Sequence, residues 1–165
     1  MGMEIRKVAA NWKHPEAPRG HTYHDGSPMT PPLFDGFKKR LADFEAEKAA
    51  WERGEFPSYA SEENKGLTFE EWDGPRPEAK DYMPDWPPEE RTHIQLYETV
   101  SEGTPLSPVC ATPEELARYM AANPEWGRPA SSYETWMAFI TGPASAPSIA
   151  IVNGTMLTGP EAGLR

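Results

Sequence analysis

At 165 residues the chain has the length of one ordinary domain, and its 19 prolines and 13 glycines indicate that much of it forms extended loops. A net charge of −10 argues against a general nucleic-acid binder, and no apolar run approaches the roughly 20 residues of a membrane-spanning helix. The single cysteine, Cys110, excludes an intramolecular disulfide framework and, with no apolar secretory signal, predicts a cytoplasmic protein.

Residues 1–33 are predicted to form an extended N-terminal arm. Prolines remove backbone hydrogen-bond donors and disfavour helix in the residue before them. Five of them fall here, namely Pro15, Pro18, Pro28, Pro31 and Pro32. We therefore divide the chain into this arm and one domain over residues 34–165.

An apolar stripe at helical spacing follows the arm. It consists of Phe34, Phe37, Leu41, Phe44 and Trp51 and predicts a helix over residues 36–53. Asp35 is placed to cap its start and Gly54 to end it. The stripe is short for a coiled coil and has Lys48 in its seam, which favours packing inside its own domain.

A proline-rich stretch with aromatic residues links this helix to the next strand. Thr68 and Glu71 form the pattern of a capping box and predict a short helix over 68–72. Beyond it, "GPRPEAKDYMPDWPPEE" is a rigid track that contains Tyr82 and Trp86. It is either a partner-binding strip or a loop held against the core by its aromatic rings.

The stretch "THIQLYETV" at 92–100 alternates as a strand does. Ile94 and Leu96 mark its core face. After "SEG", with Gly103 at positive φ, "TPLSPV" returns as a second strand. Pro105 and Pro108 cannot donate to a ladder, so this second strand is predicted at an edge of the sheet.

Two capped helices and a hairpin complete the chain. Thr112, Pro113 and Glu115 predict a helix over 113–122, and Ser132 begins another that Gly142 ends. The stretch "SIAIVNGTMLTG" predicts a hairpin with a type I′ turn at Asn153-Gly154. The fold class is therefore α+β, with a small antiparallel sheet built from hairpins, about three helices and long proline-rich loops.

The polar face of the 92–100 strand, with the loop after it, is the candidate binding surface. An aromatic ring surrounded by hydrogen-bonding groups suits a small ligand or a peptide if that face is open, whereas a solvated sheet face needs no function. The candidate residues are Tyr82, Trp86, His93, Gln95, Tyr97, Ser101, Glu102 and Thr104. An anionic ligand would take its positive charge from Arg91, Arg118 and Arg128.

Other chemistry has weaker support in the sequence. Cys110 with His93 would make a thiolate pair, but no third orienting group is evident and a buried thiol fits better. His14, His21 and His24 are possible zinc ligands without paired cysteines, so we assign neither metal nor cofactor. Mimicry of DNA would need rows of carboxylates, whereas basic residues interrupt the acidic ones on the 36–53 helix.

Several stretches carry a resemblance to a known family. They are "NWKHP", "PPLFDG", "YMPDWPPEERTHIQLYETVSEGTPLSPVCATPEELARYM", "SYETWMAFITG" and "APSIAIVNGTMLTGPEAG". In wording and order they are similar to a small uncharacterised protein family of tailed bacteriophages and prophages. The resemblance implies a place in the cytoplasm of an infected cell, or less readily in the virion, and brings no catalytic or binding residues with it.

Three functions remain open at this stage. The first is a non-enzymatic accessory phage protein that binds a host or phage macromolecule, with no nucleic acid and no membrane among its partners. The second is a protein that sequesters a small molecule or a nucleotide. The third is an enzyme of unknown reaction.

Overall fold

The computed structural model describes residues 2–16, 22, 26, 29–99, 103–124, 131–147, 149–152, 155–158 and 160–161. The chain forms two compact units. The first, here the sheet unit, comprises residues 1–33 and 86–165, and the second, here the helical unit, comprises residues 34–85. One domain over 34–165 is predicted from the sequence, whereas here the residues of the helical unit interrupt the sheet unit along the chain.

The sheet unit is built on four antiparallel strands in the order β3-β2-β1-β4. They are β1 (Gly2–Val8), β2 (His93–Glu98), β3 (Thr104–Pro105) and β4 (Ser145–Pro147). β1 pairs with β2 from Met3↔Glu98 to Val8↔His93. Residues 2–8 are thus a central strand, which the prediction of an arm over 1–33 does not anticipate. The edge position predicted for the strand after Gly103 is confirmed, since β3 is an outer strand.

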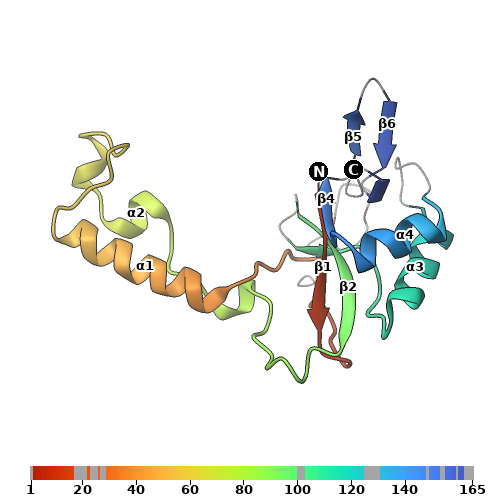
Figure 1. Cartoon of the computed structure of the whole chain (residues 1–165). Coiled ribbons are helices and arrows are strands. Elements are labelled where there is room, and N and C mark those ends of the chain that lie inside the picture. The colour runs from red at the N-terminus through yellow and green to blue at the C-terminus, as the bar shows by residue number, and fades with distance from the viewer. Residues whose placement is uncertain are drawn as a thin grey trace. The chain divides into compact units, whose positions relative to one another are not determined.

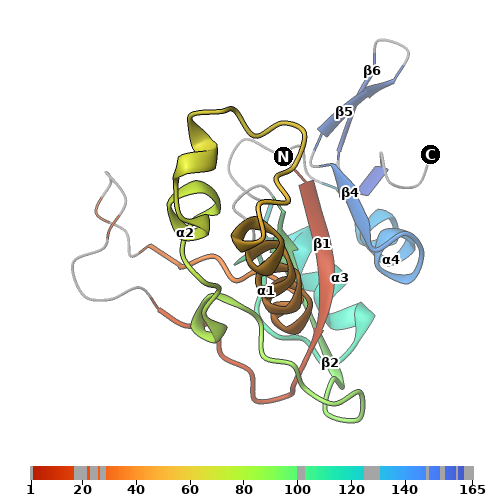
Figure 2. The same ribbon diagram turned by 90° about the vertical axis from the view of Figure 1, so that its left-hand side faces the viewer.

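Helices α3 (Pro113–Ala122) and α4 (Tyr133–Thr141) pack together beside the sheet (Figure 1, Figure 2). Alternation along β1 and β2 turns Met3 and Leu96 into the core with these helices. The buried residues of this core are Met3, Leu96, Cys110, Leu116, Ala117, Met120, Trp136, Phe139 and Ile140. Thr112 and Ser132 cap the two helices with their hydroxyl oxygens, as predicted.

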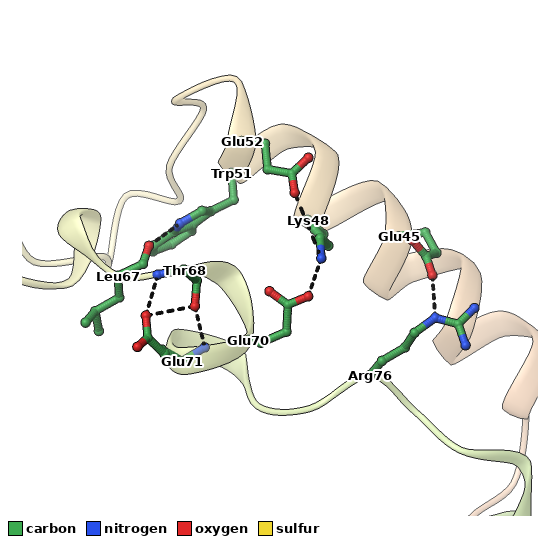
Figure 3. A network of polar contacts seen from close by, with 9 residues as sticks. All are labelled: Glu45, Lys48, Trp51, Glu52, Leu67, Thr68, Glu70, Glu71 and Arg76. Atoms are coloured by element: carbon green, nitrogen blue, oxygen red, sulfur yellow. Dashed lines mark hydrogen bonds and ion pairs between the residues drawn. The ribbon is translucent and has the colours of Figure 1, made fainter.

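The helical unit contains α1 (Phe37–Glu52) and α2 (Phe69–Asp73), joined by a loop with a 3₁₀ turn. Phe44 packs edge-on against Phe69 with ring centroids 5.1 Å apart. Thr68 and Glu71 form the predicted capping box at the start of α2 (Figure 3). Both predicted helices are confirmed, with α1 packing inside its own unit.

The start of α1 differs from the prediction in one respect. Gly36, at φ 77°, occupies the N-cap position, and no side chain caps the helix. The Asp35 cap is therefore wrong, because the chain turns into the helix one residue later, through a glycine in the left-handed region. At the other end Gly54, at φ 79°, follows the last turn as expected.

A separate hairpin follows β4. Strands β5 (Ile149–Val152) and β6 (Thr155–Thr158) pair antiparallel, with Val152 opposite Thr155. The hairpin is confirmed, while its predicted turn residues Asn153 and Gly154 lie outside the described residues. Within the described part of the chain, no helix is long and apolar enough to cross a bilayer. The α+β class is confirmed.

Candidate functional site

The face of β2 predicted to bind a ligand carries a continuous chain of hydrogen bonds. The Tyr97 hydroxyl accepts from Trp12 Nε1 at 2.9 Å and donates to Gln95 Oε1 at 2.8 Å. Gln95 Nε2 in turn donates to the carbonyl oxygen of Ser107 at 2.7 Å. We call Trp12, Gln95, Tyr97 and Ser107 the Tyr97 network. Each polar group is matched by another group of the chain, as burial requires.

Neighbouring side chains cover this network. The guanidinium of Arg6 lies 4.6 Å from the centre of the Tyr97 ring and donates to the Leu33 carbonyl oxygen at 2.7 Å. Trp86 packs edge-on against Trp12 with centroids 4.9 Å apart. Tyr97 is 0% exposed and Gln95 5% exposed. The face is thus a second core layer, and the open surface on which its ligand-binding interpretation depends is not present at Gln95 and Tyr97.

The remaining members of the predicted surface are scattered. His93 is half-buried, its Nδ1 3.0 Å from the Thr92 hydroxyl, and Thr104 is half-buried in β3. Ser101 and Glu102 lie outside the described residues. The structure therefore brings Trp86 and Tyr97 together around Trp12, but as packing.

Tyr82 closes the helical unit. Its ring lies 5.5 Å from Phe34 and 5.3 Å from Phe37. The Phe34 N–H donates to the Asp81 carbonyl at 3.0 Å, and the Met83 N–H to the Phe34 carbonyl at 2.7 Å. The beginning and end of residues 34–85 are therefore held side by side. Of the two interpretations of the proline-aromatic track, this geometry fits a loop held by its rings.

The three arginines predicted to bind an anion are not shown to form one site. Arg91 donates from Nε to the Trp86 carbonyl at 2.7 Å, Arg118 is exposed on α3, and Arg128 lies outside the described residues.

Burial raises the pKa of the Cys110 thiol, and the charge of Glu115 adds to this. Cys110 is thus a buried thiol, which disfavours the thiolate interpretation.

His14 is hydrogen-bonded within the chain through one ring nitrogen, while its buried Nδ1 has no hydrogen-bond partner among the described residues. Its Nε2 lies 2.6 Å from the Pro31 carbonyl oxygen, which can only accept, so Nε2 carries the hydrogen. No group of three or more metal-ligating residues occurs in the described part of the chain. His21 and His24 lie outside that part.

We expect His14 to make folding sensitive to acid. Burial lowers the pKa of His14 most, the Arg6 charge adds to this, and the Pro31 hydrogen bond opposes it. As pH falls, the unfolded chain therefore binds a proton at His14 before the folded chain does. The free energy of unfolding that His14 contributes is fully present above the unfolded pKa of about 6.5 and is lost as pH falls through the lower folded pKa. Urea unfolding across this range should show a flatter pH dependence for His14→Gln, with His93→Gln controlling for loss of a histidine. Identical slopes in His14→Gln and wild type would contradict the assignment.

The helical unit contains a stack of three aromatic rings, here the aromatic ladder of Trp51, Trp72 and Tyr59. Trp51 and Trp72 lie 4.5 Å apart at 23°, and Trp72 and Tyr59 lie 5.9 Å apart at 26°. Trp51 is buried, Trp72 half-buried and Tyr59 78% exposed. The ladder thus leads from the core of the unit to solvent.

Polar contacts fix the inner end of the ladder (Figure 3). Trp51 Nε1 donates to the Leu67 carbonyl at 3.0 Å, just before the capping box. Lys48, one turn before Trp51, forms ion pairs with Glu52 of α1 and with Glu70 of α2. The hydrogen bond with Glu70 raises the pKa of Lys48 and lowers that of Glu70. These contacts hold α1 and α2 at the spacing that the stacked rings need.

This ladder is not predicted from the sequence. Its rings come from the end of α1, the connecting loop and the end of α2, so no periodicity links them. The available signal was a tryptophan in the last turn of each predicted helix, Trp51 and Trp72, with Tyr59 in the polar loop between them.

Comparison with known proteins adds no relative: no family model, curated protein or solved structure matches the chain.

Proposed function

We propose that the protein is a non-enzymatic accessory protein of a tailed bacteriophage or prophage that binds a host or phage protein in the cytoplasm of the infected cell. The family resemblance described above motivates the setting. The exposed end of the aromatic ladder carries the binding part of the proposal, because exposed aromatic rings on a rigid base are typical anchors of protein interfaces.

This proposal moves the binding surface away from the strand face at Tyr97. That face is filled by the protein's own side chains, so a partner would have to unpack the sheet unit to reach it. Tyr59, in contrast, offers its ring without any rearrangement.

Affinity capture from bacterial lysate tests the surface. Tyr59→Ala should lose a protein that wild type retains, because the variant lacks the outer ring of the ladder. Tyr119→Ala is the matched control, since Tyr119 is also exposed but belongs to α3 of the sheet unit. Equal capture by wild type and Tyr59→Ala, quantified by mass spectrometry, would overturn the proposal.

A further inference from the structure

We propose that the aromatic ladder receives a basic segment of the partner, with an arginine or lysine side chain stacked on Tyr59. This inference rests on the proposed function and adds the chemistry of the partner. Tyr59 is 78% exposed, and Leu67, whose carbonyl holds Trp51, is itself 40% exposed.

The ladder is a prepared surface rather than a loose ring. Trp51 is fixed by its hydrogen bond to Leu67 and by an edge contact with Phe56 at 4.7 Å. Trp72 stacks on that fixed ring, and Tyr59 stacks on Trp72. A ligand that lies on Tyr59 therefore pays little to order its binding site.

The charge of the surrounding chain favours a cation. Residues 52–73, which supply two of the three rings, contain seven acidic and two basic residues. Both basic residues already have carboxylate partners: Arg53 donates twice to Glu55, each bond 2.9 Å long, and Lys65 pairs with Glu62. Two basic residues of α1 also contact the segment, since Lys48 pairs with Glu52 and Glu70 and Arg40 pairs with Asp73. Acidic residues still outnumber basic ones with these two counted, so the segment presents a net negative field, which attracts basic partners and repels nucleic acid.

Cations over aromatic rings already occur inside this protein. Arg6 lies 4.6 Å from the centre of Tyr97, Arg40 5.7 Å from that of Phe44, and Lys65 5.8 Å from that of Phe56. The negative face of an aromatic ring attracts a cation placed above it, and a planar guanidinium can also stack. Tyr59 offers the same kind of ring to a cation from outside.

Fluorescence polarisation with labelled peptides of equal length tests the inference. The probes are an alternating Gly-Arg peptide, a Gly-Glu peptide and a proline-rich peptide, each titrated with the full chain at low ionic strength. We expect the Gly-Arg peptide to bind best and its affinity to fall as salt is added. Binding of the proline-rich peptide in its place would overturn the inference, since aromatic surfaces also dock polyproline segments.

Substitutions at Tyr59 separate stacking from general charge attraction. Tyr59→Leu removes the ring and should weaken the Gly-Arg peptide about two- to fivefold, whereas Tyr59→Phe keeps the ring and should retain binding. Unchanged circular dichroism would show that both variants are folded. Equal binding by wild type and Tyr59→Leu would overturn the inference.

The two proposals can fail separately. A protein captured from lysate through Tyr59, without any binding of the Gly-Arg peptide, would overturn the basic-segment inference alone. Capture that does not depend on Tyr59 would overturn the proposed surface and this inference with it.

Discussion

Replacing Gly103 with alanine should destabilise the sheet unit by about 3 kcal/mol. Gly103 has φ 116°, a conformation that side chains rarely adopt, and an added Cβ would lie 2.0 Å from the Leu33 carbonyl oxygen. Rotation of a side chain cannot relieve a clash with backbone. The same oxygen accepts the hydrogen bond from Arg6, and the Leu33 N–H donates to the Gly103 carbonyl, so any shift of Leu33 breaks further contacts.

Hydrogen exchange of the amides in β1 and β2 measures this effect within the sheet unit itself. Gly66→Ala, in the helical unit, controls for a glycine-to-alanine change without a clash, because its added Cβ would meet no atom within 4 Å and Gly66 has no positive φ. This control should leave the β1 and β2 amides as protected as in wild type and change overall stability by less than about 0.5 kcal/mol. If Gly103→Ala protected the same amides as well as wild type does, the close approach of Leu33 to the hairpin loop would be contradicted.

Local signals in the sequence account for the helices. Capping hydroxyls, a proline at the first helical position and glycines after the last turn act within a few residues, so they predict the bounds of α1, α2, α3 and α4 to within about two residues. Asp35 fails as a cap because the left-handed Gly36 shifts the helix start.

No local signal in the sequence identifies the strand with which β1 pairs. The strand GMEIRKV pairs with β2, which lies some ninety residues later in the chain. Alternation of apolar residues over seven positions indicates a strand but does not determine which other strand it pairs with. Insertion of residues 34–85 between the two strands hides a simple antiparallel pair behind a long connection.

The burial of the polar face of β2 has a related cause. Gln95 and Tyr97 would be exposed on an uncovered strand, but Arg6 of the paired strand β1 lies over the Tyr97 ring and Trp12 donates to the Tyr97 hydroxyl. Side chains with polar groups can be buried when their partners come from distant parts of the chain, and alternation along one strand does not record those partners.

Replacing Tyr97 with alanine distinguishes a core residue from a binding residue. Tyr97 is 0% exposed, and its truncation leaves a large cavity beside Arg6 and His14, so we expect a loss of about 4 kcal/mol of unfolding free energy. Tyr97→Phe keeps the ring but leaves Trp12 Nε1 and Gln95 Oε1 without their partner, which should cost about 2 kcal/mol.

Tyr59→Ala is the matched control, since it makes the same truncation at an exposed tyrosine and should change stability by less than about 0.5 kcal/mol. Urea unfolding followed by circular dichroism gives the stabilities, and lysate capture gives the binding. A Tyr97→Ala protein with wild-type stability that has lost its partner would make the β2 face the interface after all. Loss of stability in Tyr97→Ala, together with loss of the partner in a stable Tyr59→Ala, would instead place recognition on the helical unit, because only there does binding change without the fold.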